Sequence, residues 1–177
     1  MKATDEKLMP GTGGASDGAP EGAGLGATQG DDGEWKSRIV DDRPGLARVI
    51  NSVSRVAVIG IKPETAGGAS YYVPQIMQAG GFKIIPVPVY FPDLQEILGE
   101  PVHRSLVTID PPADMVQLFR RSNDVARHVE EILAARPKVV WMQLGISNEA
   151  AAERFAKAGI TVVQNRCFKI EMAEVGR

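Results

Sequence analysis

The stretch RVAVIGIKPETAGGAS, residues 55 to 70, decides the fold of this chain. It begins with a short apolar run that is typical of a buried strand, and a Gly- and Pro-rich turn then leads into a helical pattern. A helix that starts in this way leaves unpaired backbone N–H groups, which can hold an anion. The pattern therefore predicts a cradle for a nucleotide phosphate. Gly60 allows the sharp turn, while Gly67 and Gly68 let a phosphate approach the backbone.

This cradle departs from the fingerprint of NAD-binding proteins. That fingerprint is G-x-G-x-x-G, with an acidic residue at the end of the second strand that holds the ribose. Here Gly60 is followed by Ile61, Lys62 and Pro63, and the second predicted strand ends in PVPVY with no acid before Asp93. The sequence therefore disfavours NAD without excluding it.

Composition predicts one globular domain behind a tail. The chain has 177 residues, of which 44% are hydrophobic and 24% charged. Residues 1–34 hold nine of the 19 glycines and show no periodicity, so we predict a disordered, Gly-rich acidic tail there and a folded domain over residues 35–177. The folded part carries 18 basic and 15 acidic residues. That small excess suits a polyphosphate ligand and lacks the basic stripe of a nucleic-acid surface.

The sequence also bears on location and partners. No window approaches the roughly 20 apolar residues of a membrane span, and no secretory signal is visible, so we predict a cytoplasmic protein without a membrane partner. The single cysteine, Cys167, cannot form an internal disulfide, which fits a reducing compartment. A homodimer would suit so small an α/β domain, although no residue demonstrates one.

From Arg55 onward, short apolar runs alternate with amphipathic stretches. The runs that predict strands are residues 56–60, 83–87, 115–119, 138–143 and 161–164. The stretches that predict helices are residues 70–79, 92–98, 122–135, 148–158 and one after Cys167, preceded by a short helix within 35–52 that has Pro44 in its first turn. Strands separated by helices form parallel sheets. We therefore predict an α/β fold: a doubly wound, mostly parallel five-stranded sheet, Rossmann-like, with helices on both faces.

In such folds ligands bind beyond the carboxyl ends of the strands. Lys62 and Ser70 lie beside the cradle, and Arg120 and Arg121 follow the third strand, where a guanidinium can grip a phosphate through two hydrogen bonds. One of these arginines can instead be a surface ion-pair partner. Further along, Gly145 permits close backbone approach and Asn165 can hydrogen-bond a base or an amide, although either residue can simply shape a turn.

Six blocks then carry a resemblance to a known family. They are VAVIGIKP, SYYVPQIMQAGGFKIIPV, ILGEPVHRSL, FRRSNDV, VVWMQLGISNEAA and QNRCFKIE. In order and spacing this set resembles the small stand-alone CoA-binding proteins, which are relatives of the N-terminal domain of the succinyl-CoA synthetase alpha subunit. The resemblance covers about residues 47–173.

The resemblance implies a coenzyme A site at named positions. It assigns the CoA phosphates to the loop Gly60, Ile61, Lys62 and Pro63, and it places Pro88 and Val89 beside the nucleotide. It puts Phe119, Arg120, Arg121 and Ser122 on the adenosine side, and Gln143, Gly145, Ile146 and Asn165 on the pantetheine side. One departure is that AGGA at residues 66–69 replaces a loop that is commonly rich in Ser and Arg.

No catalytic machinery emerges beside this site. We expect His103 and His128 to be surface residues, and no Ser-His-acid set or metal cluster can be assembled. Cys167 is the one reactive candidate, through exchange with the CoA thiol. The leading prediction is therefore a protein that binds CoA or an acyl-CoA without transforming it. The alternatives are an NAD(P)-dependent oxidoreductase and an interaction or scaffold protein with a vestigial cleft.

Overall fold

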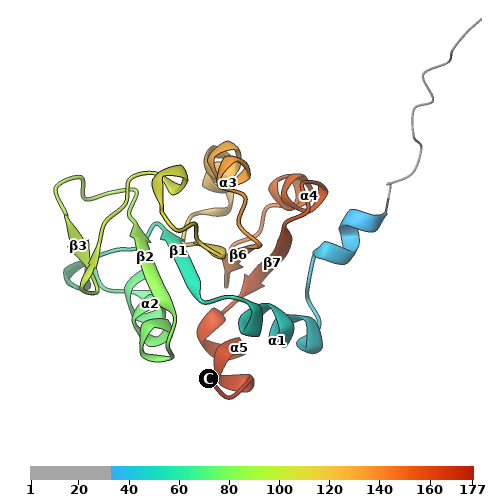
Figure 1. The fold of residues 1–177 in the computed structure, drawn as a ribbon, viewed down its shortest axis with the longest axis horizontal. Coiled ribbons are helices and arrows are strands. Elements are labelled where there is room, and N and C mark those ends of the chain that lie inside the picture. The colour runs from blue at the N-terminus through green and yellow to red at the C-terminus, as the bar shows by residue number, and fades with distance from the viewer. Residues whose placement is uncertain (1–32) are drawn as a thin grey trace, which may run out of the picture. The chain divides into compact units, whose positions relative to one another are not determined.

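The computed structural model describes residues 33–177, so the predicted disordered tail lies almost wholly outside the described residues. Five parallel strands form one sheet in the order β2-β1-β5-β6-β7 (Figure 1). Their bounds are β1 Arg55–Ile59, β2 Lys83–Val87, β5 Met115–Leu118, β6 Val139–Gln143 and β7 Thr161–Arg166. The predicted parallel sheet is confirmed, and each strand begins or ends within two residues of its predicted bounds.

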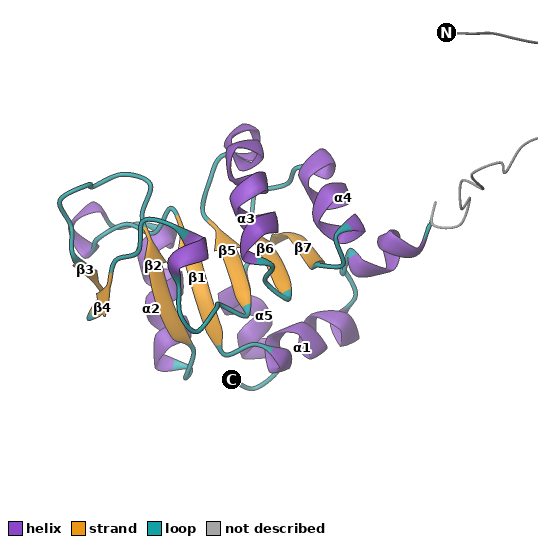
Figure 2. Cartoon of the chain, turned by 45° about the horizontal axis from the view of Figure 1, so that its top comes forward, coloured by secondary structure: helices purple, strands orange, loops and turns teal. Residues whose placement is uncertain are grey.

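Both faces of the sheet are covered by helices, as predicted (Figures 1 and 2). The helices are α1 Arg43–Ser52, α2 Ala69–Ala79, α3 Val129–Ala135, α4 Glu149–Lys157 and α5 Phe168–Glu174. Helices α1, α2 and α5 lie on one side and pack against strand residues such as Val56 and Trp141. Helices α3 and α4 lie on the other side, against residues such as Ala57 and Val140. Because successive side chains of a strand point to opposite faces, the central strands must be apolar throughout.

The topology reverses beside β1. The chain passes from β1 to β2 on one side and then returns to β5 on the other side of β1. In open α/β sheets this switch point is where ligands bind, because the chain leaves the two neighbouring strands toward opposite faces of the sheet, which opens a crevice there. The residues that follow β1 and β5 are therefore the ones to inspect for a site.

Two predicted helices differ in the structure. Residues 92–98 were predicted as a helix, which was wrong: the chain there makes a turn and then a hairpin of β3 Glu96–Ile97 and β4 Glu100–Pro101. Residues 122–135 are divided into a 3-10 helix, η4 Ser122–His128, followed by α3. Two further short 3-10 helices are η2 Glu64–Ala66 and η3 Leu106–Thr108.

The segment before α1 lies along the outer edge of β7. A 3-10 helix, η1 Glu34–Arg38, leads to Ile39, which forms a parallel bridge with Val162 of β7. The N–H of Val40 donates to the carbonyl oxygen of Val162 at 2.8 Å. The Asp42 side chain then accepts from the N–H of Gly45 and caps α1, as expected for a helix with Pro44 in its first turn.

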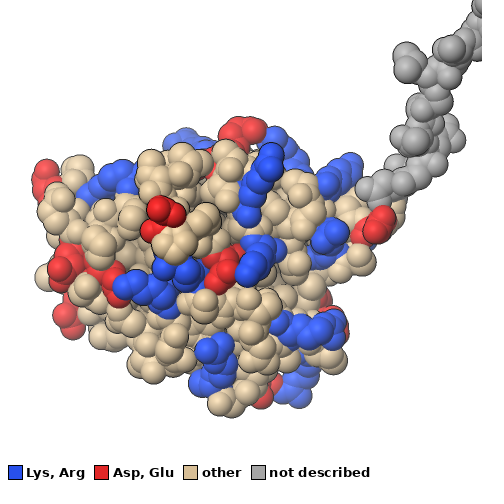
Figure 3. Space-filling view, in the orientation of Figure 1, with Lys and Arg blue, Asp and Glu red and all other residues tan. Residues whose placement is uncertain are grey.

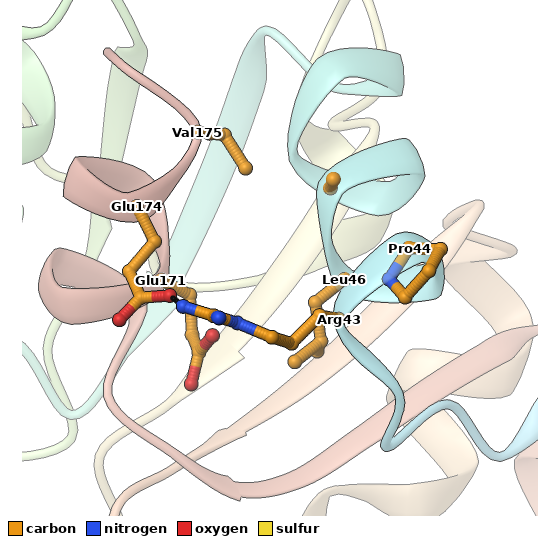
Figure 4. A pocket seen from close by; sticks show the side chains of 7 residues that line it. Arg43, Pro44, Leu46, Glu171, Glu174 and Val175 are labelled. Atoms are coloured by element: carbon orange, nitrogen blue, oxygen red, sulfur yellow. Dashed lines mark ion pairs between the residues drawn. The ribbon is translucent and has the colours of Figure 1, made fainter.

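A shallow hollow of about 390 Å³ lies between α1 and α5. Figure 4 shows Arg43 of α1 reaching across it to an ion pair with Glu174 of α5. None of the predicted site residues lines this hollow. No helix among residues 33–177 is both long enough and apolar enough to cross a bilayer.

Candidate functional site

The loop after β1 and the loop after β5 meet at the switch point, and Gly60 is where they touch. The N–H of Gly60 donates to Val87 of β2, and its φ is +84°. A Cβ placed on Gly60 would lie 2.4 Å from the carbonyl oxygen of Phe119. Gly60 is therefore required by its own backbone conformation and by the close approach of the neighbouring loop. The next residue, Ile61, is buried in the core beneath the loop.

The predicted cradle ends in an open helix N-terminus. The N-cap of α2 is Gly68, whose φ is +81°, and no side chain caps the helix. Among the hydrogen bonds of residues 33–177, none is donated by the backbone N–H of Gly68, Ala69 or Ser70. A Cβ on Gly68 would meet no atom within 4 Å. Space and unpaired donors therefore coincide here, which is the arrangement that binds an anion.

These donors face a hollow of about 410 Å³, which we call the cradle hollow. Its lining residues are Lys62, Ala66, Gly67, Gly68, Ala69, Ser70, Phe119, Arg120, Arg121, Gln143, Leu144 and Ile146. Part of this lining consists of cationic side chains and backbone N–H donors. Another part is apolar and includes Leu144, which has 60% of its surface exposed. Such a lining suits a ligand that joins phosphates to a less polar arm.

Arg120 is the most unusual side chain in the lining. Only 8% of it is exposed, and its single ion pair within residues 33–177 joins Nη2 to Asp124 at 3.5 Å. Its Nε is buried and has no hydrogen-bond partner in that range. The guanidinium also lies 5.4 Å from the centre of the Tyr90 ring. A buried cation is costly unless it is fully paired, so Arg120 is poised to accept an anionic partner from the hollow.

Two further cations line the cradle hollow. Lys62 follows β1 and is half-buried, and Arg121 is exposed at the start of η4. Neither forms an ion pair with any other residue of the described range 33–177. The sequence offered one arginine as an ion-pair partner at the surface, and in the structure it is the buried Arg120 that carries the ion pair. On the face seen in Figure 3, Lys and Arg are interspersed with Asp and Glu.

The loop after β6 forms the far wall. Gln143 is buried: its Oε1 accepts from Gln117 at 3.0 Å and from the N–H of Phe168 at 3.3 Å, and its Nε2 donates to Sγ of Cys167 at 3.3 Å. These bonds fix the amide at the wall of the hollow. Cys167 itself is half-buried and is not among the lining residues.

The fifteen predicted site residues divide into groups. The structure brings seven of them into the cradle hollow: Lys62, Ser70, Phe119, Arg120, Arg121, Gln143 and Ile146. Others shape the surrounding loops: the N–H of Gly145 donates to Oδ1 of Asn165 at 2.7 Å, and Oγ of Ser122 accepts from the N–H of Ser147 at 3.2 Å. Pro63 is the N-cap of η2. Whether any of them contacts a ligand stays a prediction.

Pro88 and Val89 lie in a different hollow, of about 370 Å³, at the carboxyl ends of β1 and β2. We call it the His128 hollow, because that side chain lines it too. The prediction that His103 and His128 are surface residues holds only in part, since both are half-buried, and Nε2 of His128 is buried with no partner among residues 33–177. Sequence reasoning missed this position because the charged residues around His128 are typical of a solvated face.

Comparison with known proteins identifies the family to which this chain belongs. Residues 54–173 match the model of the family described as CoA binding domain. The chain belongs to this family. It is 34% identical over 128 residues to YneT of Bacillus subtilis (strain 168), an alignment that spans 72% of this chain and 92% of YneT.

Solved structures agree with this assignment. A Thermus thermophilus protein, cell-free ID.343, superposes with a TM-score of 0.69 at 29% identity, covering 76% of this chain and 99% of that protein. A hypothetical protein from Pyrococcus horikoshii OT3 gives a TM-score of 0.69 at 24% identity, covering 76% of this chain and 92% of the other, which supports the fold alone. The family match thus begins directly before β1, and segment 33–53 lies before it.

Proposed function

We propose that this chain binds coenzyme A or an acyl-CoA in the cradle hollow and does so without transforming it. The diphosphate lies against the open N-terminus of α2, where the N–H groups of Ala69 and Ser70 have no acceptor within the described chain. Arg120 supplies the charge, and the pantetheine arm follows the apolar lining toward Leu144 and Ile146.

The observation that carries the proposal is the state of Arg120. Its side chain is only 8% exposed, and among residues 33–177 its one carboxylate partner is at 3.5 Å and its buried Nε has no partner. Folded proteins rarely leave a buried cation so poorly paired, and such groups gather at functional sites. Family membership gives the anion its chemical class. The absence of an acid directly after β2, where Pro88, Val89 and Tyr90 stand, favours CoA over NAD.

Calorimetric titration of the full chain with CoA, acetyl-CoA, NAD and NADP tests the proposal. We expect saturable binding of CoA, and binding of NAD and NADP that is at least tenfold weaker. A tighter fit for NAD or NADP would favour an oxidoreductase, and binding of none of the four would favour a scaffold with a vestigial cleft. Either result would overturn the proposal. Native mass spectrometry of freshly purified protein gives a second readout, because a co-purified ligand is identified by its mass.

The experiment has a matched control within the chain. Arg48 of α1 is exposed and lies outside the cradle hollow. Replacing it by Met removes the same charge as replacing Arg120, and we expect the Arg48 variant to bind CoA as the unmodified chain does. Cytoplasmic location and a homodimer remain predictions beside this proposal.

A further inference from the structure

His128 lines one of the two hollows at the carboxyl edge of the sheet. It is the last residue of η4, directly before α3, and it lines the His128 hollow. The other lining residues are Ile59, Val87, Pro88, Val89, Pro92, Arg104 and Glu131. Most of this lining is apolar, so a charged imidazole would be poorly solvated there.

The other polar side chains in this hollow are already engaged. Nη2 of Arg104 donates to the carbonyl oxygens of Phe91, Pro92 and Leu94 at 3.2, 2.7 and 2.7 Å. Oε1 of Glu131 accepts from the N–H of Leu106 at 2.8 Å. By contrast, Nε2 of His128 is buried and has no partner among residues 33–177. Hydrogen bonds therefore engage the side chains of Arg104 and Glu131, whereas no hydrogen bond within residues 33–177 fixes whether Nε2 of His128 carries a proton.

The charges around His128 come from η4, α3 and the loop after β5. Burial and then the nearby Arg120 guanidinium lower the pKa of His128, with a further contribution from Arg127, while Glu131 and Asp124 oppose them. The imidazole is therefore mostly neutral at pH 7 when the cradle hollow holds no anion. After burial, the largest contribution to this lowered pKa comes from the same Arg120 that lines the cradle hollow.

This arrangement couples the binding of an anion beside Arg120 to the protonation of His128. Among the described residues 33–177, Asp124 is the single carboxylate partner of Arg120, and it is shared with Arg127, whose Nε lies 3.7 Å from Oδ1. An anion bound beside Arg120 would neutralise part of the positive field that acts on His128. Protonation of His128 then becomes easier, and by linkage a protonated His128 strengthens the binding of the anion.

We propose that His128 is a positioning residue for the cradle hollow that takes up a proton when an anion binds beside Arg120. This inference rests on the proposed function and adds its regulation: affinity for the ligand rises as the pH falls from 8 toward 6. If the anion makes protonation of His128 threefold easier, affinity rises by less than threefold across that range, because the full factor is reached only at pH values below the lowered pKa of His128.

The direct test is proton NMR of the imidazole in the full chain. The sequence has only two histidines, so a His103→Gln variant assigns the His128 signal. The probe is dephospho-CoA, because its diphosphate stays ionised over pH 6 to 8 whereas the 3′-phosphate of CoA titrates near pH 6. We expect saturating dephospho-CoA to raise the pKa of His128 measurably. An unchanged titration curve with ligand bound would overturn the inference.

Calorimetry gives a second, independent arm. Titration with dephospho-CoA at pH 6, 7 and 8 should show the rise in affinity for the unmodified chain and for His103→Gln, and a flat profile for His128→Gln. A slope retained by His128→Gln would also overturn the inference, and melting curves verify that this variant is folded. If neither CoA nor dephospho-CoA binds, the proposed function is refuted as well. If dephospho-CoA binds but its affinity does not change with pH, only the role proposed for His128 is refuted.

Discussion

Replacing Arg120 by Met separates a binding residue from a structural one, because the two roles predict opposite effects on stability. Met keeps the length and the apolar stem of the side chain and removes the guanidinium. In the structure the Arg120 side chain is 8% exposed, and within residues 33–177 its guanidinium has one loose ion pair, at 3.5 Å, with Asp124. Its buried Nε has no partner in that range. Removing it therefore takes away little that stabilises the unliganded fold.

The magnitudes follow from these contacts. Replacing a poorly paired buried charge by an apolar side chain of similar volume is neutral or stabilising by about 1–4 kcal/mol. Loss of the contact with the exposed ring of Tyr90 costs about 0.5–1 kcal/mol. We thus expect unliganded stability to be unchanged or higher. A hydrogen bond between a charged group and the ligand contributes about 1.5–3 kcal/mol, so CoA affinity should fall about 10- to 150-fold.

The assay pairs urea unfolding of the unliganded protein with calorimetric titration of CoA. The Arg48→Met variant should change neither quantity. If Arg120→Met lost about 2 kcal/mol or more of stability while binding CoA as before, Arg120 would be a structural ion-pair partner and the reasoning from its poor pairing would be refuted.

Three further predictions concern the fold that carries the site. Gly60→Ala places a Cβ 2.4 Å from a backbone oxygen at a φ of +84°, so we expect a loss of about 3 kcal/mol or more in urea unfolding; a loss below 1 kcal/mol would contradict the close approach. Burial opposes ionisation of Asp114, but hydrogen bonds from Lys138, the N–H groups of residues 54 and 55 and the Ser54 hydroxyl hold its pKa well below the ordinary 3.8. Its stabilising effect is therefore complete above about pH 4 and fades at lower pH. Asp114→Asn should lower stability by about 1–2 kcal/mol at pH 7 and much less at pH 2, and an equal loss at both pH values would refute this assignment. Val40→Pro deletes the hydrogen bond to β7 and should lower the free energy of unfolding by about 1 kcal/mol. The exposed edge of β7 should also make the protein associate at high concentration, which light scattering measures. Unchanged stability and unchanged scattering would show that the segment before α1 does not protect this edge.

The sheet was predictable because the apolar runs of its strands are easy to recognise in the sequence. Runs such as VAVI in β1 and VVWM in β6 are apolar on both faces, as a strand covered by helices on both sides requires. The cradle was predictable for a similar reason, since Gly60 and the pair at residues 67 and 68 all adopt positive φ. These features depend on residues that are close together in the sequence.

The failures arise where a local pattern is ambiguous or where contacts are distant. Residues 92–98 have helical spacing of Leu and Ile, but Leu98 and Gly99 adopt φ of +58° and +71° and form the two-residue turn of a hairpin. A Gly after one bulky residue is a weak signal for such a turn. The burial of Arg120 and His128 depends on the switch point, which brings together loops from separate strands. Sequence spacing alone cannot supply that information.

Each outer border of the sheet is partly covered by a neighbouring segment. On β7 the carbonyl of Val162 accepts from the N–H of Val40, and on β2 the carbonyl of Pro86 accepts from the N–H of His103 at 2.8 Å. Pro86 moreover has no N–H to offer at that border. A second copy that extended the sheet at either border would therefore first have to displace one of these segments.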